Sequence, residues 1–459
     1  MSGRFPPTLF RGRRYAVLGL GRNGVAAARA LAAMGADVTA WDDSEAARAS
    51  LDNASLNNAS LANAGAGASG GLTLSPLDDP GRFDALVLSP GIPHRLPVPH
   101  PFAARAIAAG IPMLSDAELL FEAVRGSGSG ARFAGITGTN GKSTTTALLA
   151  HLLDTAGVAH AAGGNLGPAA LSLPLLPDGG VYVLEMSSYM LERMQTLRFD
   201  AACLLNLSPD HLDRHGDLAG YGAAKLAIFA RQTAADLAVL GLDDAWSRAQ
   251  AARLGQAPAR LVTISGGDGL PGAAPALPGP HNAQNAAAAA AMALHLGAAP
   301  DAVAAGLASF TGLAHRQRRI ASIDGIAFVD DSKATNADAA ARALGCYERL
   351  IWIAGGLAKA GGIEALAPLF PRIAEALLIG RDAPLLADTL ARHDVRHRVL
   401  RDLHHAVPAA LAAARVHAAE VVLLSPACAS FDQFADFEAR GVEFARLVHG
   451  LQTSGRRAG

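Results

Sequence analysis

The sequence predicts an α/β protein of three domains, each built around a mainly parallel β-sheet. Its 459 residues are too many for one ordinary domain. Short β-forming runs alternate with helical stretches along the chain, which is typical of parallel sheets. Two glycine-rich turns each join such a run to a helix, and the alternation restarts near 311–312. We therefore expect Rossmann-like first and third domains, with a phosphate-binding-loop ATPase domain between them.

The composition excludes several classes of protein. Hydrophobic residues make up 51% of the chain and charged residues 17%, enough apolar material for several cores. The 39 Lys and Arg nearly balance the 40 Asp and Glu, so no basic surface indicates nucleic acid or a membrane as a partner. No apolar run is long enough to span a bilayer. The three scattered cysteines form no disulfide or zinc pattern, and we expect a cytoplasmic protein.

The first domain, residues 1–114, opens with a predicted strand at 15–20, a helix at 25–34 and a second strand at 37–41. The loop Gly19-Leu-Gly-Arg-Asn-Gly24 joins the first strand to the helix, and Asp42 follows the second strand. This pattern fits a dinucleotide-binding turn, in which glycines admit a phosphate and an acid binds the ribose. Three interpretations stay open from these residues: NAD(P), another nucleotide or nucleotide sugar, and a structural turn.

Two further segments complete this domain. A predicted strand at 84–89 ends in the turn Ser89-Pro-Gly-Ile92. Residues 50–71 have low complexity, and we expect a surface insertion without chemistry.

The central domain, residues 115–312, contains the strongest motif, Gly135-Ile-Thr-Gly-Thr-Asn-Gly-Lys-Ser-Thr144. A predicted strand, 131–137, precedes it, and a predicted helix, 143–156, follows it. Glycines let backbone N–H groups face phosphate oxygens, and the helix N-terminus adds positive potential. Lys142 is placed to reach the terminal phosphates of ATP, and the Ser143 hydroxyl to bind Mg²⁺.

Acidic and histidine residues after two later strands are candidate metal ligands. Glu185 ends the predicted strand 181–185, where the carboxyl ends of parallel strands line a ligand crevice. His211 and His215 follow the predicted strand 201–207, but no glutamate follows His211, which excludes a zinc-protease motif. Taken alone, His211 could equally be a hydrogen-bonded loop histidine. The alanine-rich helix 282–296 is expected to be scaffold.

The third domain, residues 313–459, contains predicted strands at 326–330, 349–354, 376–379 and 421–424. Helical stretches separate them, which predicts another mostly parallel sheet.

Several motifs together resemble the Mur ligase family over essentially the whole chain apart from residues 50–71. These are the phosphate loop, Leu184-Glu-Met-Ser-Ser188, Asp210-His-Leu-Asp-Arg214 and Tyr221-Gly-Ala-Ala-Lys-Leu226. The strings Asp331-Ser-Lys-Ala-Thr-Asn336 and Leu424-Ser-Pro-Ala-Cys-Ala-Ser-Phe-Asp-Gln-Phe434 resemble the branch that adds D-glutamate. One departure is Leu357, since well-known members carry an acid there, before the lysine that matches Lys359.

The resemblance implies an ATP-dependent carboxylate–amine ligase of peptidoglycan precursor synthesis that works through an acyl phosphate. Its small-molecule substrates would be ATP, UDP-N-acetylmuramoyl-L-alanine and D-glutamate, with two Mg²⁺ ions, and we expect a monomer. Implied catalytic residues are Lys142, Asn165, His211 and Lys225, with Ser143, Glu185, His211 and carbamylated Lys225 as metal ligands. Implied ATP contacts are Gly138, Thr139, Asn140, Gly141, Lys142, Ser143, Thr144, Asn282, Asn285, Arg316 and Asp331.

The resemblance also assigns the two remaining substrate sites. It favours a nucleotide-sugar site in the first domain. Implied contacts to the UDP substrate are Gly21, Arg22, Asn23, Asp42, Ser89, Pro90, Gly91, Asn165 and Ser187. Implied glutamate contacts are Lys333, Thr335, Lys359, Ser430 and Phe437. Taken alone, Lys225 would be a solvated helix lysine and Lys359 an exposed loop lysine. Cys428 has no assigned base, and we interpret it as structural.

Three other functions compete with this one. An amide ligase of the same architecture could add a different amino acid or act on a folate, but a folate enzyme should lack the turn Ser89–Ile92. An NAD(P) oxidoreductase would leave the second phosphate loop unexplained. A non-catalytic nucleotide-binding regulator would not need Glu185, His211 and Lys225 together.

Overall fold

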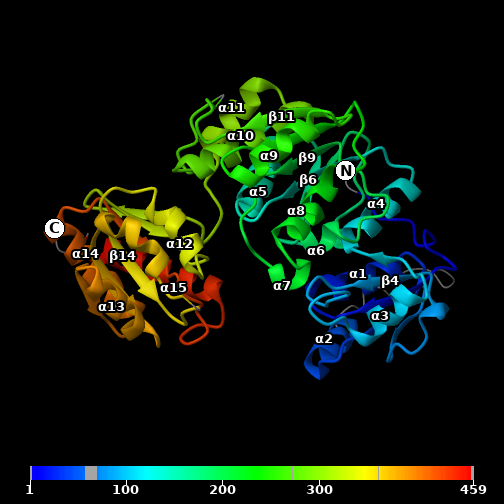
Figure 1. Ribbon diagram of the computed structural model, residues 1–459, viewed down its shortest axis with the longest axis horizontal. Helices are drawn as coiled ribbons and strands as arrows, with labels where there is room; N and C mark the ends of the chain where they lie inside the picture. The colour runs from blue at the N-terminus through cyan, green and yellow to red at the C-terminus, as the bar shows by residue number, and fades with distance from the viewer. Residues whose placement is uncertain (1–2, 57–69, 271, 360, 456–459) are drawn as a thin grey trace. The chain divides into compact units, whose positions relative to one another are not determined.

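Three separate β-sheets organise the protein, as the computed structural model shows for residues 3–56, 70–270, 272–359 and 361–455 (Figure 1). All strand pairs in the first two sheets are parallel. The third sheet is parallel except for the antiparallel pairing of its edge strand β12 with β13. The predicted α/β class with mostly parallel sheets is therefore confirmed.

The first sheet has the order β3-β2-β1-β4-β5. Its strands are β1 (Arg14–Leu18), β2 (Asp37–Trp41), β3 (Leu72–Leu74), β4 (Ala85–Leu88) and β5 (Met113–Leu114). Its helices are α1 (Arg22–Ala33), α2 (Glu45–Leu56) and α3 (Pro101–Ala108), with the short η2 (Pro80–Arg82). The expected insertion at 50–71 is partly wrong, because it begins inside α2, where Leu51 is buried. Residues 57–69 of that expectation lie outside the described residues.

The second sheet has the order β11-β10-β9-β6-β8-β7. Its strands are β6 (Arg132–Thr137), β7 (His160–Gly164), β8 (Val181–Glu185), β9 (Ala201–Leu204), β10 (Leu237–Gly241) and β11 (Arg260–Ile264). Its larger helices are α4 (Asp116–Gly126), α5 (Lys142–Thr155), α8 (Leu218–Leu226), α9 (Ala245–Leu254), α10 (Pro280–His295) and α11 (Pro300–Ser309). Shorter turns are η3 (Ala170–Ser172), α6 (Ser188–Leu191), α7 (Leu212–His215) and η4 (Ala227–Phe229).

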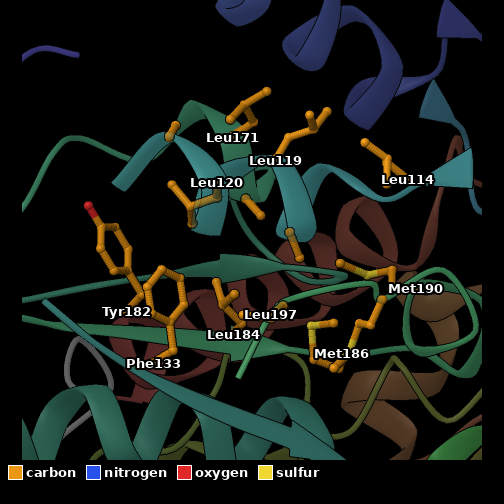
Figure 2. Packing of buried hydrophobic residues seen from close by; sticks show 14 of the residues in the cluster. Leu114, Leu119, Leu120, Phe133, Leu171, Tyr182, Leu184, Met186, Met190 and Leu197 are labelled. Atoms are coloured by element: carbon orange, nitrogen blue, oxygen red, sulfur yellow. The ribbon is translucent and has the colours of Figure 1, made fainter. Parts of the chain in front are cut away.

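One continuous apolar core joins the first two sheets. Figure 2 shows Leu119 and Leu120 of α4 in the same cluster as Phe133 and Tyr182 of the second sheet. The ring centroids of Phe133 and Tyr182 are 4.9 Å apart in a stacked arrangement. Glu118 reinforces this connection, because its fully buried carboxylate accepts hydrogen bonds from the backbone N–H groups of Gln195, Thr196 and Leu197. The two sheets therefore form one compact unit.

The third sheet has the order β12-β13-β17-β14-β15-β16. Its strands are β12 (Arg318–Ile323), β13 (Ile326–Asp330), β14 (Leu350–Gly355), β15 (Ile373–Ile379), β16 (His397–Val399) and β17 (Val421–Leu424). Its helices are α12 (Ala337–Leu344), α13 (Ala383–Arg392), α14 (Leu403–His417), α15 (Phe437–Gly455) and η5 (Glu364–Arg372). Alternate residues of β14, such as Ile351 and Trp352, enter separate apolar cores, so both faces of this sheet are buried.

The chain divides into two compact units. The first unit runs up to Ala273 and resumes at Asn282–Ala308, while the second contains Ala274–His281 and the chain from Ser309 onward. The domain limits at 114/115 and 312/313 stay predictions. Among the described residues, no helix combines the length and apolar character needed to cross a bilayer.

Candidate active site

A glycine-rich loop connects β6 to α5, at the carboxyl end of a central strand. Gly138 and Gly141 have φ values of 150° and 84°, which side-chain-bearing residues rarely adopt. A Cβ atom at Gly141 would also lie 2.4 Å from the Asn285 amide oxygen of α10. Only glycine therefore fits at 141, where Asn285 of α10 packs against the loop predicted to bind ATP. The Asn285 amide also donates to the Asn282 side chain at 3.3 Å.

The side chains of Lys142, at the start of α5, and Asn206, just beyond β9, hold this loop in place. The Lys142 ammonium donates to the carbonyl oxygens of Gly138 and Thr139, each at 2.9 Å. The Asn206 side chain accepts from the Asn140 N–H at 3.0 Å and donates to the Asn140 carbonyl at 3.1 Å. Sequence reasoning assigned no role to Asn206. It lies two residues beyond β9 and four residues before the motif Asp210-His-Leu-Asp-Arg214, and this position is the signal that could have identified it.

Glu185 has the features of a cation ligand. It is the last residue of β8, is only 2% exposed and lies in register with Ile136 of β6. One carboxylate oxygen accepts from the Asn165 side-chain amide at 2.7 Å. The other oxygen, Oε2, is buried and has no hydrogen-bond partner. Because an unpaired buried carboxylate oxygen is costly, this arrangement suits a bound cation.

Lys225 lies on α8 and is 1% exposed. Its Nζ atom donates to the Gly138 carbonyl at 2.9 Å and lies 4.6 Å from the Tyr221 ring centroid. Burial, and then the charge of Lys142, hold the pKa of Lys225 well below its usual value. The interpretation of Lys225 as a solvated helix lysine is therefore wrong, because α8 turns it toward the phosphate loop.

His211 is placed less tightly than Glu185 and Lys225. Its backbone is left-handed, with φ of 52°, and 45% of its side chain is exposed. Its ring centroid lies 5.2 Å from that of Tyr189 and 6.2 Å from that of Tyr221, which also contacts Lys225. Within the described ranges, no three His, Cys, Asp or Glu residues form a metal cluster by themselves. Protein ligands from His, Cys, Asp and Glu alone would therefore fill only part of a cation's coordination shell here.

The loop and the turn predicted to bind the nucleotide sugar lie together at the ends of β1 and β4. The Ser89 hydroxyl donates to the Gly19 carbonyl at 2.7 Å. The Asp42 carboxylate accepts from the Leu20 N–H at 2.7 Å, so one of its oxygens orders the loop. Helix α1 begins at Arg22, about one turn earlier than predicted. Gly24, in its first turn, packs against the backbone of Gly19, where a Cβ atom on residue 24 would lie 1.8 Å from the Gly19 carbonyl oxygen.

The same loop reaches residues of the second sheet. Arg22 donates to the Asn165 carbonyl at 2.9 Å, and Asn23 donates to the Asp116 carboxylate at 3.1 Å. Burial raises the pKa of Asp116 to about 6. The Ser187 hydroxyl caps α6 by accepting from the Met190 N–H at 3.3 Å.

Two buried arginines, which sequence reasoning missed, hold the turn that contains Pro90 and Gly91. Arg193 donates to the carbonyls of Leu88 at 2.5 Å and Ile92 at 3.2 Å. Arg214 donates to the same Ile92 carbonyl at 2.9 Å. These contacts link residues 105 and 122 positions apart, so the local sequence does not reveal them, although Arg214 ends the motif Asp210-His-Leu-Asp-Arg214.

In the second unit, three segments follow the adjacent strands β13, β17 and β14 and meet at their carboxyl ends. Residues 331–336 contain Lys333 and Thr335, residues 425–430 contain Ser430, and residues 356–359 contain Lys359. The last two segments pair through hydrogen bonds of 2.8 and 2.9 Å between the backbones of Leu357 and Ala429.

The side chains at this edge differ in exposure. The Lys333 ammonium lies 4.3 Å from the Phe437 ring centroid, Ser430 is buried and Lys359 is exposed. The Asp382 carboxylate accepts from the Ala358 N–H at 2.9 Å, so an acid contacts this loop although position 357 is leucine.

Asp331 and Arg316, predicted to contact ATP, also belong to the second unit. Asp331 accepts from the Ser425 hydroxyl at 2.7 Å and from the Gln317 N–H at 3.2 Å. Burial raises the pKa of Asp331 to about 7. Arg316 is partly buried and follows His315, which pairs with Asp330 at 2.7 Å.

Solved structures show the same fold. UDP-N-acetylmuramate-alanine ligase from Thermotoga maritima matches 96% of this chain and 99% of its own, with a TM-score of 0.56 and 18% identity. The MurF ligase from Thermotoga maritima in complex with ADP matches 80% of this chain and 90% of its own, with a TM-score of 0.54 and 18% identity. At these identities the likeness concerns the fold alone.

Sequence comparisons are more specific. Residues 136–272 match the Mur ligase middle domain. UDP-N-acetylmuramoylalanine--D-glutamate ligase from Paramagnetospirillum magneticum is 48% identical over 97% of this chain and 98% of its own length. The enzymes of the same name from Rhizobium etli and Caulobacter vibrioides are 45% and 44% identical, over 97% and 98% of this chain and of their own lengths. Similarity of this extent over nearly the whole length shows that the chain belongs to the UDP-N-acetylmuramoylalanine--D-glutamate ligase family, a branch of the Mur ligases.

Proposed function

We propose that this protein joins D-glutamate to UDP-N-acetylmuramoyl-L-alanine at the expense of ATP, in the synthesis of peptidoglycan precursors. The observation that carries the proposal is the phosphate loop with Lys142, next to a buried carboxylate, Glu185, that has one unpaired oxygen. Family membership supports the identity of the substrates. We expect the enzyme to act as a monomer in the cytoplasm.

The reaction has two steps that balance in atoms and charge. A carboxylate oxygen of the muramoyl-alanine attacks the γ-phosphorus of ATP, and ADP leaves. The neutral amine of glutamate then attacks the acyl carbon, and the tetrahedral intermediate breaks its C–O bond to expel phosphate. The nitrogen gives up one proton to solvent or to the departing phosphate and keeps one N–H in the amide. Both steps concentrate negative oxygens, which Lys142, the loop N–H groups and the N-terminus of α5 would stabilise. Asn165, held against Glu185, would orient the reacting groups.

We assign Mg²⁺ to the region around the carboxyl end of β6. Ser143, Glu185, His211 and Lys225 would hold two ions, and phosphate oxygens of ATP would complete their coordination. Mg²⁺ bound there would neutralise charge on the transferred phosphate. The unpaired Oε2 of Glu185 supports this fit.

We propose that Lys225 acts as a carbamate. Its amine would attack the carbon of CO₂, form an N–C bond and release a proton, which gives a carboxylate in place of a cation. A buried amine beside Lys142 favours this change, because the carbamate removes a repulsion between like charges. We expect Lys225→Ala to lose ligation but keep ATP binding in calorimetry, and Lys225→Glu to recover part of the activity. Electron density for an unmodified Lys225 in the complex with ATP and Mg²⁺ would contradict the proposal.

We place the UDP part of the substrate at Gly21, Arg22, Asn23 and Asp42, with the turn Ser89-Pro90-Gly91. Helix N-terminus and loop N–H groups there suit a pyrophosphate. Asn165 and Ser187 would contact the part of the substrate nearer the reacting carboxylate. The hydrogen bond from Arg22 to the Asn165 backbone supports this continuity.

We place glutamate at Lys333, Thr335, Lys359, Ser430 and Phe437, because two carboxylates need cations and hydroxyl donors. Lys359→Ala should raise the KM for glutamate about tenfold to a hundredfold, since a lost charged hydrogen bond costs about 1.5–3 kcal/mol. The KM for ATP, measured in the same assay, should change far less. Equal increases in both KM values would move Lys359 out of the glutamate site.

The deciding experiment measures phosphate release from ATP with UDP-N-acetylmuramoyl-L-alanine and a panel of amino acids. We expect turnover with D-glutamate and little with L-glutamate, L-lysine or meso-diaminopimelate. Efficient turnover with another amino acid would overturn the substrate assignment. No ATP-dependent turnover with any of them would overturn the ligase assignment.

A further inference from the structure

Arg440 is one of the most deeply buried charged residues of the second unit. It lies in the first turn of α15 and is 1% exposed. Its Nε atom donates to the Ser332 hydroxyl at 2.9 Å, and one terminal nitrogen donates to the Ser332 carbonyl at 2.8 Å. Both terminal nitrogens donate to the Cys428 carbonyl at 3.2 Å, and one also reaches the Gly355 carbonyl at 3.5 Å.

These partners belong to the three segments that carry the proposed glutamate contacts. Ser332 precedes Lys333 after β13, Cys428 lies two residues before Ser430 after β17, and Gly355 ends β14 ahead of Lys359. The helix that carries Arg440 also begins with Phe437, and the Ser332 hydroxyl donates to the Phe437 carbonyl at 2.8 Å. One guanidinium therefore contacts the segments 331–336 and 425–430, and the last residue of the strand that leads into the segment 356–359.

The chemistry of these contacts distinguishes Arg440 from an ordinary ion pair. Among the described residues, its hydrogen bonds go to a hydroxyl and to main-chain carbonyls and not to a carboxylate. A buried charge without a hydrogen-bonded counterion is costly, so its retention requires compensating contacts. The planar guanidinium presents five N–H donors in a fixed fork, whereas an ammonium group presents three from a single point. Lysine therefore cannot reproduce the geometry.

We propose that Arg440 is a positioning residue for the amino-acid site: it fixes the three segments relative to one another and to Phe437 without touching the amino acid. This inference rests on the proposed function. It predicts an effect that is largest for the amino acid and smallest for the UDP substrate, because the contacts assigned to that substrate lie in the other compact unit, whereas Asp331, an expected ATP contact, directly precedes Ser332.

The test compares Arg440→Lys, Arg440→Met and Ser332→Ala with the wild-type enzyme. Arg446→Met, on the same helix in an exposed pair with Glu443, is the control. For each variant, KM values are measured separately for D-glutamate, ATP and UDP-N-acetylmuramoyl-L-alanine, and Tm is recorded. We expect Arg440→Lys to raise the KM for D-glutamate about tenfold to a hundredfold, to raise the KM for ATP less, and to leave that for UDP-N-acetylmuramoyl-L-alanine within about twofold. Ser332→Ala should give a smaller increase of the same selectivity, and the control none.

A uniform change in all three KM values, or an unchanged KM for D-glutamate in a folded Arg440→Lys variant, would overturn the proposal. If Arg440→Met does not fold, Arg440→Lys and Ser332→Ala decide the question by the same comparison. Wild-type enzyme that fails to use D-glutamate would refute the proposed function instead, so the two failures are distinguishable.

Discussion

Lys142 is the first residue of α5, and its side chain folds back onto the loop before it. Replacing it with alanine removes both a charge for the transferred phosphate and two contacts within the loop. We expect Lys142→Ala to slow ligation by about 10³-fold or more, as loss of a charge clamp in phosphoryl transfer typically does. Phosphate release checks the rate, and circular dichroism checks that the fold persists. Lys142→Arg keeps the charge, so its ligation rate should fall between those of the wild-type enzyme and Lys142→Ala. Near-normal turnover of Lys142→Ala would contradict the phosphate-loop assignment.

The residues that could be predicted from the sequence are those whose position depends on neighbouring residues. Lys142 follows a strand and a glycine-rich turn, so the residues next to it in the sequence were enough to predict its place in the fold. Arg193 and Arg440 could not be found in this way, because their partners lie up to 108 positions away. Lys225 shows the same limit, because helical periodicity does not reveal that its face of α8 meets the phosphate loop.

At the scale of elements, α15 depends on a glycine for its close approach to the sheet. A Cβ atom at Gly441 would lie 2.0 Å from the His315 ring and 2.8 Å from the Asp330 carboxylate, whereas one at Gly450 on the same helix would meet open space. We expect Gly441→Ala to destabilise the protein by about 1–3 kcal/mol through overpacking. Gly450→Ala should be neutral or stabilise it by up to about 1 kcal/mol, because alanine favours helix. Thermal unfolding of the two variants measures the difference, and equal shifts in Tm would contradict this account.

The elements themselves were largely predictable. The runs 326–330 and 421–424 form strands with the predicted limits, because continuous apolar sequence suits a strand buried on both faces. The edge strand β12 was not predicted, since it begins with two arginines, has no continuous apolar run, and pairs in an antiparallel way that depends on the turn before β13. The part of α2 that extends into the low-complexity segment was missed, because Leu51 is a buried apolar residue in a sequence otherwise typical of a surface loop.

For the whole molecule, the proposed substrate contacts fall in two compact units. ATP and the nucleotide sugar are assigned mainly to the first, and glutamate to the second. Reaction requires the attacking amine and the acyl carbon to come within about 3–3.5 Å. We therefore expect the two units to close when substrates bind, with Thr311-Gly312 at the hinge, where Gly312 has φ of 79°. Small-angle scattering should show a smaller radius of gyration with ATP, Mg²⁺ and the nucleotide sugar. Identical profiles with and without these ligands would argue against closure.

The short stretch Ala274–His281 belongs to the second unit although the chain on both sides of it belongs to the first. The polypeptide therefore passes between the units three times, after Ala273, His281 and Ala308. Because of this connectivity, the two compact units cannot be exchanged between proteins at a single junction. A chimaera or a truncation joined at Ser309 would separate the second unit from eight of its own residues, including Pro278, whose carbonyl lies 3.6 Å from the Cys346 thiol. Recombination between relatives at Ser309 would preserve the native contacts of the second unit only if Ala274–His281 came from the same parent as the C-terminal sheet.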